Sequence, residues 1–248
     1  MSYNFKLLDG GGNGSVALDT TLKEKGKSAD AKAVGDRFDA IIGTYSEGLA
    51  YTLKDNGEYE VSGIGACTDT DIIIPSVYDG HRVTSIGARA FDSCSNLTSI
   101  VIPDSVTSIG FSAFIRCSNL TSVVIPKGVT EIQMQTFFNC QSLTRVTIPD
   151  SVTIIGLSAF YNCINLESIV ISKNVTHVGE GAFNGCIKAI PIYCEAETQP
   201  EGWESKWNIN NVPVVWGAKL DFAGVNRAFE EVKNYVDQAL GVIENGSY

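Results

Sequence analysis

A fixed period of 23 residues is the feature of this chain that most constrains its fold. The period is kept by five cysteines and by five phenylalanines, each three residues before a cysteine: Cys94, Cys117, Cys140, Cys163 and Cys186, with Phe91, Phe114, Phe137, Phe160 and Phe183. One such unit is too short to bury its apolar face alone, so neighbouring units must stack and share a core. The sequence therefore predicts a solenoid.

The apolar residues inside each period follow the spacing L-x-x-L-x-L of leucine-rich repeats. Its three columns are Leu97, Leu120, Leu143 and Leu166; Ile100, Val123, Val146 and Ile169; and Ile102, Ile125, Ile148 and Ile171. Positions two apart lie on one face of a strand, and a following proline, which has no backbone N–H, ends that strand in three of the copies. We expect a leucine-rich-repeat-type β solenoid with short strands, a short helical turn before each cysteine, and flanking α-helices.

The two ends of such a solenoid need caps, because parallel strands are only about 4.8 Å apart and five coils leave large apolar ends. Lys54-Asp55-Asn56-Gly57 predicts the turn of a β-hairpin that covers the first coil. The insertion Val77 to Arg82 departs from the repeat. After the last cysteine of the column, Trp203, Trp207 and Trp216 can seal the other end.

The segment from Pro103 to Pro126, PDSVTSIGFSAFIRCSNLTSVVIP, resembles the BspA-like leucine-rich repeat family of bacterial surface and secreted proteins. The resemblance covers roughly residues 47–217. It implies an adhesin or other binding protein without catalysis. The chain is accordingly divided into an N-terminal arm and helix (1–46), a capped solenoid (47–217) and a C-terminal amphipathic helix (218–248).

Composition narrows the classes of partner. With 44% hydrophobic and 19% charged residues the chain can bury a full core. Its net charge of −10 and the lack of a basic run argue against nucleic acid or an anionic membrane as a binding partner. The N-terminus has no basic stretch followed by an apolar segment, and no run reaches the ~18 apolar residues of a membrane span. We therefore expect no signal peptide and no transmembrane segment.

Both flanks show helical periodicity. Ser28 can cap a helix from about Ala29 to Ile42. The C-terminal stripe alternates steps of four and three residues: Val225, Phe229, Val232, Val236, Ala239 and Ile243. The helices either pack within the chain or form a coiled coil between subunits, and the heptad pattern favours a homo-oligomer, a dimer or trimer. Asp19 to Ile41 also resembles a connector of phage tail-fibre and baseplate-type proteins.

Residues suited to catalysis or metal binding are scarce. His81 and His177 have no second ligand at metal-binding spacing, and Asp69 and Asp71 lack the other oxygens of a calcium loop. We predict no catalytic residue, no metal and no cofactor. The cysteine column is predicted to be reduced, because coils about 4.8 Å apart exceed the ~3.8 Å between Cβ atoms that a disulfide prefers.

One departure from the repeat suggests a binding surface. Large apolar side chains occupy two columns where small or polar ones are expected: Phe111, Met134 and Leu157, and Ile115, Phe138 and Tyr161. Spaced i, i+4 on a helical turn, they would form one stripe, which a monomer rarely exposes. A partner or a flanking helix of the same chain could cover it. The outward strand positions, such as Ser99, Ser122 and Arg145, form a flatter second candidate.

These features favour a non-enzymatic structural or adhesion protein associated with a phage virion, as fibre, baseplate or decoration, that displays its solenoid to a surface ligand. Its partners would be other virion proteins or a host-surface protein or glycan, at the virion or an extracellular surface. The alternative is a bacterial BspA-like surface adhesin. An enzyme is a distant third.

Overall fold

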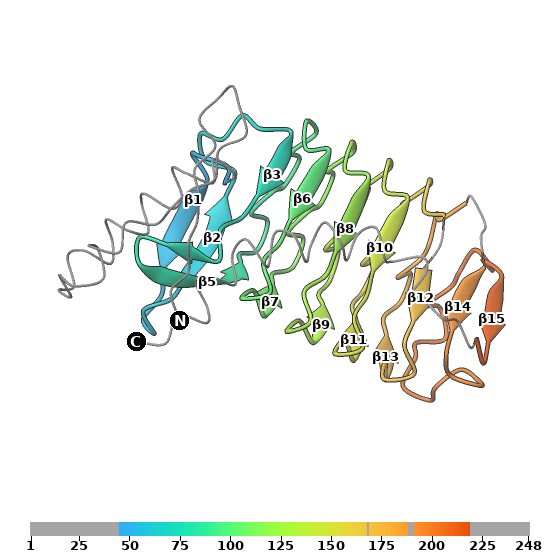
Figure 1. The fold of residues 1–248 in the computed structure, drawn as a ribbon. Helices are drawn as coiled ribbons and strands as arrows, with labels where there is room; N and C mark the ends of the chain where they lie inside the picture. The colour runs from blue at the N-terminus through green and yellow to red at the C-terminus, as the bar shows by residue number, and fades with distance from the viewer. Residues whose placement is uncertain (1–44, 168, 188–190, 219–248) are drawn as a thin grey trace, which may run out of the picture. The chain divides into compact units, whose positions relative to one another are not determined.

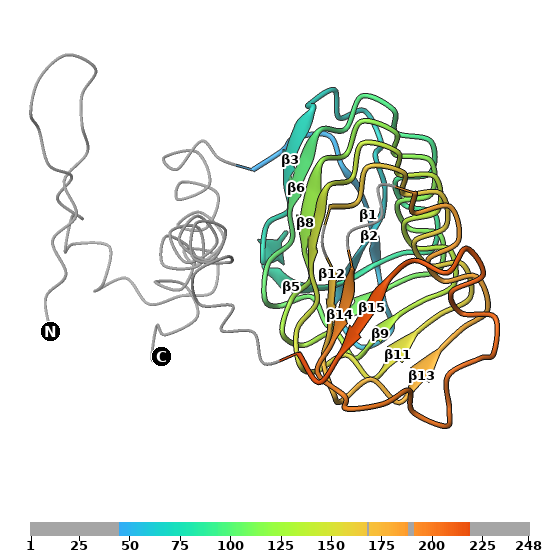
Figure 2. The same cartoon turned by 90° about the vertical axis from the view of Figure 1, so that its right-hand side faces the viewer.

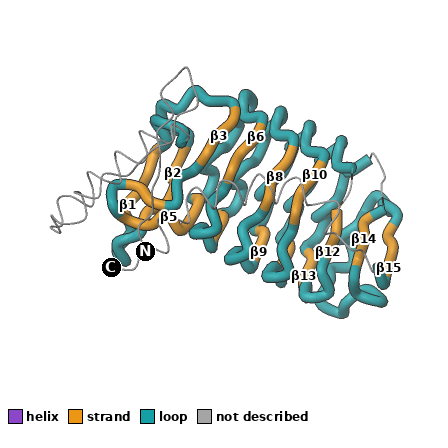
Figure 3. The backbone as a smooth tube through the Cα atoms, in the orientation of Figure 1, coloured by secondary structure: helices purple, strands orange, loops and turns teal. Residues whose placement is uncertain are grey.

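The computed structural model of this protein describes residues 45–167, 169–187 and 191–218. These residues form a solenoid of short strands and turns, and no helix occurs among them (Figures 1 and 3). The strands are β1 (Ala50–Leu53), β2 (Tyr59–Gly63), β3 (Asp71–Ile73), β4 (Val77–Tyr78), β5 (His81–Ile86), β6 (Ser99–Val101), β7 (Ser108–Ile109), β8 (Ser122–Val124), β9 (Glu131–Ile132), β10 (Arg145–Thr147), β11 (Ile154–Ile155), β12 (Ile169–Ile171), β13 (His177–Val178), β14 (Ile192–Cys194) and β15 (Val214–Trp216). The predicted repeat solenoid is confirmed. The predicted flanking helices and the stripe Val225, Phe229, Val232, Val236 and Ile243 lie outside the described residues.

The first side of each coil is a parallel strand. In Figure 1, β3, β6, β8 and β10 lie side by side, followed by β12, β14 and β15, and both groups are parallel sheets. Ile100 of β6 points into the core, and Ile102 is also buried although the strand has already ended at Val101. Pro103 then turns the chain and accepts a hydrogen bond from the Val106 N–H, 3.0 Å from N to O. The strand and its proline stop therefore lie where the repeat predicts them.

The second side carries two-residue strands, and a glycine follows most of them. A Cβ atom on Gly110 would lie 2.5 Å from the backbone N of Ala88, and one on Gly156 would lie 2.6 Å from that of Met134. Glycine is needed because neighbouring coils touch there. Gln133 occupies the same column, and there the sheet divides: β7 pairs with β5, while β9 pairs with β11.

The third side is a run of turns, so the predicted short helical turn is wrong. Two positions in each coil have left-handed backbone, with φ of 55° at Ser112 and 60° at Arg116. Gly181 and Gly185 fill the same columns in the last repeat. A residue with positive φ interrupts the succession of helical dihedrals. Alternate N–H groups instead reach the next coil, as from Phe91 to the Ala113 carbonyl at 2.8 Å.

Five phenylalanines and the cysteines beside them fill the core. Successive rings of the phenylalanine column stack with centroids 5.3–5.4 Å apart, and all five are fully buried. We number the coils 1 to 5 by Phe91, Phe114, Phe137, Phe160 and Phe183. The view in Figure 2, turned by 90°, shows the successive coils superimposed around this interior.

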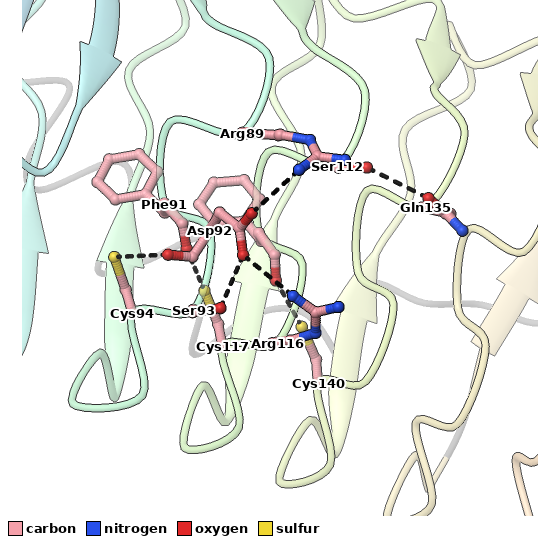
Figure 4. A network of polar contacts seen from close by, with 11 residues as sticks. Arg89, Phe91, Asp92, Ser93, Cys94, Ser112, Arg116, Cys117, Gln135 and Cys140 are labelled. Carbon is pink, nitrogen blue, oxygen red and sulfur yellow. Dashed lines mark hydrogen bonds and ion pairs between the residues drawn. The ribbon is translucent and has the colours of Figure 1, made fainter.

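Four of the five thiols in the cysteine column donate to the backbone of the preceding coil, whereas Cys94 donates to the Asp92 carbonyl of its own coil. The Cys140 thiol donates to the Phe114 carbonyl at 3.1 Å, and Cys117 donates to that of Phe91 at 3.0 Å (Figure 4). Cys163 and Cys186 do the same at 3.2 Å. All seven cysteines lie among the described residues and are free thiols. The column therefore joins consecutive coils through thiol hydrogen bonds.

Both predicted caps are present. β1 and β2 form an antiparallel hairpin around the Lys54 to Gly57 turn, and β2 pairs with β5 of the first coil. The insertion after Ile74 is itself a small hairpin, β4 with β5, around Asp79 and Gly80, which both have positive φ. At the other end, Trp207 packs edge-on against Phe183 at 5.9 Å. The hairpin and the tryptophans thus cover the two ends of the core.

Candidate partner-binding surface

Three large apolar side chains are exposed in one column on the turn side of the solenoid. Phe111, Met134 and Leu157 are 42%, 41% and 44% exposed and occupy coils 2, 3 and 4. The backbone fixes this column, because the Ser112 N–H donates to the Met134 carbonyl and the Gln135 N–H to that of Leu157, each at 2.9 Å. We call Phe111, Met134 and Leu157 the apolar ladder.

The second predicted column contributes differently. Ile115 is only 5% exposed and belongs to the interior, so its prediction as an exposed binding residue is wrong. Phe138 and Tyr161 are half-buried and stack on each other, with centroids 4.7 Å apart. The i, i+4 argument fails because a left-handed residue, such as Ser112, lies between the two columns. The structure thus keeps three of the six residues as a solvent-facing set.

Charged residues lie at both ends of the apolar ladder. In coil 1, Asp92 pairs with Arg89 at 3.6 Å and with Arg116 of coil 2 at 3.8 Å (Figure 4). Two guanidinium groups and one carboxylate leave this end with a local positive charge. The backbone N–H of Arg89 donates to the Phe111 carbonyl at 3.1 Å, so the positively charged coil 1 end lies directly beside the ladder.

The coil 5 end carries a carboxylate. Glu180 continues the ladder column, since its carbonyl accepts the Ser158 N–H at 3.0 Å. Its side chain is 54% exposed and pairs with Lys206 of the C-terminal cap at 3.7 Å. The exposed apolar run is therefore bounded by arginines at one end and by an exposed ion pair at the other.

Sequence reasoning missed Ile209. This cap residue is 46% exposed, and its Cδ1 lies 3.9 Å from the place where a Cβ on Gly181 would be. It therefore adds apolar surface beside coil 5. No periodicity marks it, because it lies after the repeats have ended, and only an apolar residue in the otherwise polar run Asn208 to Asn211 could have drawn attention to it.

The second candidate surface is the outward face of the strand side. Asp71 at its first strand accepts hydrogen bonds from the hydroxyls of Ser99 at 2.5 Å and Thr98 at 2.7 Å. These hydrogen bonds hold the pKa of the Asp71 carboxyl below its usual value, and the bond from Ser99 has the largest effect. Thr121 and Thr144 each bond the threonine carbonyl of the preceding coil at 3.1 Å. Most of these polar groups serve the stacking of the coils.

The two histidines have structural contacts. His81 packs edge-on against Tyr59 with centroids 6.0 Å apart, and His177 Nδ1 lies 2.7 Å from the Gly202 carbonyl oxygen. Among residues 45–167, 169–187 and 191–218, no group of three or more His, Cys, Asp or Glu side chains could hold a metal ion. In the same part of the chain, no helix has the length and apolar character needed to cross a membrane.

A protein-family model identifies the solenoid. Residues 67–197 match the BspA type leucine rich repeat region in six copies, which is more than half of the 248 residues. The chain therefore belongs to the BspA-type leucine-rich repeat family. This confirms the resemblance drawn from the repeat unit. A search of curated proteins finds no match.

Solved structures with this fold come from several bacteria. The T. pallidum leucine rich repeat protein TpLRR is 28% identical, with a TM-score of 0.56 over 60% of this chain and 70% of its own. A leucine rich cell surface protein from Faecalibacterium prausnitzii is 33% identical, with a TM-score of 0.54, over 67% of this chain and 41% of its own. A Bacteroides ovatus leucine-rich repeat protein is 31% identical, with a TM-score of 0.54, over 64% and 41%.

These similarities bear on the two functional hypotheses. The chain spans only about two fifths of the F. prausnitzii and B. ovatus proteins. One of those proteins is described as a cell surface protein, which supports the hypothesis of a bacterial surface adhesin. The phage hypothesis rests on the Asp19 to Ile41 resemblance and the C-terminal heptad stripe, both outside the described residues, and on the expected lack of a signal peptide. Neither the family match nor these structures add support to it.

Proposed function

We propose that this chain is a non-enzymatic binding protein of the adhesin type, displayed at a bacterial surface. Membership of the BspA-type family and the similarity to a leucine rich cell surface protein support this proposal. The scaffold suits the role, because backbone and side-chain hydrogen bonds repeat from coil to coil and hold outward side chains at a regular spacing.

The apolar ladder is the observation that carries the proposal. Three neighbouring side chains, each more than 40% exposed, are costly in water unless a partner covers them. Methionine and leucine contribute apolar area but no hydrogen bonds, whereas a sugar ligand needs polar groups around an aromatic face. The partner chemistry that fits the ladder is therefore a protein surface with apolar side chains of its own.

Binding of the full-length chain to cells tests the proposal. Labelled protein is applied to panels of bacterial and epithelial cells, and bound fluorescence is measured by flow cytometry. We expect saturable binding that falls at least about tenfold when Phe111, Met134 and Leu157 are all changed to Ser. The matched control changes Val101 and Val124, on the strand face, to Ser. Equal loss in both variants, or no binding to any surface, would contradict the proposal.

A further inference from the structure

We propose that Cys67 and Cys94 are a redox pair, which a small disulfide oxidant such as oxidised glutathione joins into a disulfide between the segment after β2 and coil 1. The structure shows both residues as free thiols, which is the reduced form of the pair. Neither the apolar ladder nor the proposed function is needed for this pairing.

Cys67 belongs to the cysteine column, although it lies 27 residues before Cys94 and so escapes the 23-residue period. The Ile64 N–H donates to the Ala90 carbonyl of coil 1 at 3.1 Å, which is the bond that Phe91 makes to coil 2. The Cys67 N–H then returns to the Ile64 carbonyl at 3.0 Å, as the Cys94 N–H returns to that of Phe91 at 3.2 Å. The two cysteines therefore occupy equivalent places in neighbouring turns of the chain.

The thiol bond that fixes the inner members of the column is missing between these two turns. Cys117 donates to the Phe91 carbonyl of the preceding coil at 3.0 Å. The same bond from Cys94 would end on the Ile64 carbonyl. The Cys94 thiol instead makes a long contact of 3.9 Å with the Asp92 carbonyl of its own coil (Figure 4). The sulfur of Cys94 is thus not held by its neighbour as the inner sulfurs are.

The backbone around Cys67 also leaves the register of the inner coils. In coil 1 the left-handed residue is Ser93, whose N–H donates to coil 2 at 2.8 Å, whereas before coil 1 it is Gly65. The Ala66 N–H turns away from coil 1 and donates to the Gly48 carbonyl at 2.8 Å. Strict alignment keeps Cβ atoms about 4.8 Å apart, beyond the ~3.8 Å of a disulfide. Because the alignment is broken here, it no longer keeps the two thiols apart.

Both thiols of the pair are accessible to a small oxidant. Cys67 and Cys94 are half-buried, whereas the next two members of the column, Cys117 and Cys140, are fully buried. Burial raises the pKa of the Cys94 thiol, and the charges of Asp92 and Cys67 raise it further, so the two thiols lie within range of each other's charge. Since a raised pKa leaves little Cys94 thiolate at neutral pH, we expect Cys67 to react first.

The reaction is a thiol–disulfide exchange in two steps. The Cys67 thiolate attacks one sulfur of oxidised glutathione, forms a mixed disulfide and releases one glutathione thiolate. The Cys94 thiolate then attacks the Cys67 sulfur and expels the second glutathione. The protein gives up two protons and two electrons, and the glutathione disulfide takes them up as two thiols.

The bridge closes a loop that contains β3, β4 and β5 and ties coil 1 to the end of the N-terminal hairpin. A coil of a solenoid contacts only its neighbours, so opening begins at the ends of the stack. A disulfide opposes this opening by restricting the unfolded chain. The junction that lacks a thiol hydrogen bond then gains a covalent link, in oxidising surroundings such as a cell surface but not in a reducing cytosol.

Oxidation of the full-length chain provides the test. The protein is incubated with oxidised glutathione, and its intact mass and its peptides are measured without reduction. We expect the loss of two hydrogen atoms, no retained glutathione and one linked peptide that contains Cys67 and Cys94. The melting temperature should rise by about 5 °C or more and return when a reductant is added. Hydrogen exchange should slow in β3 and β5 and stay unchanged in β11 and β13.

Three serine variants check the order of the two steps. Cys94→Ser should retain one glutathione on Cys67, because no second thiol is there to expel it. Cys67→Ser should react more slowly than the original chain, and the melting temperature of neither variant should rise on oxidation. The matched control is Cys140→Ser, which changes a locked thiol of the same column and should still form the bridge.

Other products would overturn the pairing. These are a disulfide that uses any other cysteine, a dimer linked through Cys67, and a stable glutathione adduct on the original chain. A chain that oxidised glutathione leaves unchanged would also overturn it. Cell binding through the apolar ladder is measured separately, so none of these results bears on the proposed function.

Discussion

Each buried thiol of the cysteine column fills space in the core and donates a hydrogen bond to the preceding coil. Cys140 is fully buried, and desolvation raises the pKa of its thiol to about 12 from an ordinary value of 9.0. The folded chain therefore keeps this proton at a pH where an unfolded chain releases it. Stability from the raised pKa is complete below pH 9.0 and is lost progressively as the pH rises toward 12.

We expect Cys140→Ser to flatten the pH dependence of stability. Between pH 9 and pH 11 the free energy of unfolding of the original chain should fall more steeply than that of the variant, by up to about 1.4 kcal/mol per pH unit for this thiol. Urea titrations at several pH values measure the difference. Lysine and tyrosine titrate equally in both proteins, so the difference between the two curves of unfolding free energy against pH reports on Cys140 alone. Parallel curves would mean that folding does not protect the Cys140 thiol from ionisation.

The phenylalanine column packs consecutive coils against one another through buried, stacked rings. Phe137 stacks on Phe114 and Phe160 at 5.4 Å and is inaccessible to solvent. Phe137→Ala should lower the free energy of unfolding by roughly 3–5 kcal/mol, since it removes both ring contacts and leaves a cavity. Phe137→Leu, which retains most of the volume, serves as the control. A melting temperature unchanged by the alanine variant would disprove the role of the column.

At the scale of single residues, the sequence predicted core positions well and exposed ones less well. The 23-residue period alone identified the phenylalanine column and the buried Ile100 and Ile102, because burial repeats with the coil. It misplaced Ile115, because the direction of that side chain depends on a left-handed residue at Ser112. Serine and arginine give no sequence sign of positive φ, whereas Gly181 and Gly185 in the last repeat do.

At the scale of the elements, one glycine column decides whether short strands can pair. Gly110, Gly156 and Gly179 leave room for the neighbouring backbone, and the sheet is interrupted between β7 and β9, where Gln133 replaces glycine. A Cβ atom in this column and close pairing of the coils exclude each other. The sequence contains the glycine period, but the reason for it appears only when the coils are stacked.

This contrast gives a paired prediction. Gly156→Ala should lower the free energy of unfolding by about 2 kcal/mol or more, because the new Cβ would lie 2.6 Å from the Met134 backbone N, which cannot move without its coil. Gln133→Ala should cost less than about 0.5 kcal/mol, since the chain already accommodates a Cβ there. Chemical denaturation of both variants decides, and equal losses would show that the strand break has another cause.

At the scale of the whole molecule, stacking explains why the caps could be predicted and their details could not. Any solenoid must cover its terminal coils, so the Lys54 to Gly57 turn and the tryptophans had clear roles before the structure was known. The second hairpin, β4 with β5, forms in the insertion Val77 to Arg82, where the sequence showed a departure from the repeat but no hairpin. The position of Ile209 beside coil 5 depends on the path of an irregular segment, which no period describes.

The last prediction concerns Asp221 to Tyr248, whose apolar stripe Val225, Phe229, Val232, Val236 and Ile243 must be buried if it forms a helix, because isolated helices of this length are marginal in water. The described tryptophan cap ends upstream of this segment, so deleting Asp221 to Tyr248 should leave the solenoid folded.

If the stripe joins subunits, the full-length chain should be an oligomer at micromolar concentration and the truncated chain a monomer, since the apolar ladder alone is too small to hold a pair there. If the stripe instead covers the apolar ladder within one chain, the full-length protein should be a monomer and the truncated one should aggregate, and changing Phe111, Met134 and Leu157 to Ser should restore its solubility. Light scattering on the three proteins distinguishes these arrangements, and a monomeric full-length chain rules out the coiled coil for the isolated protein.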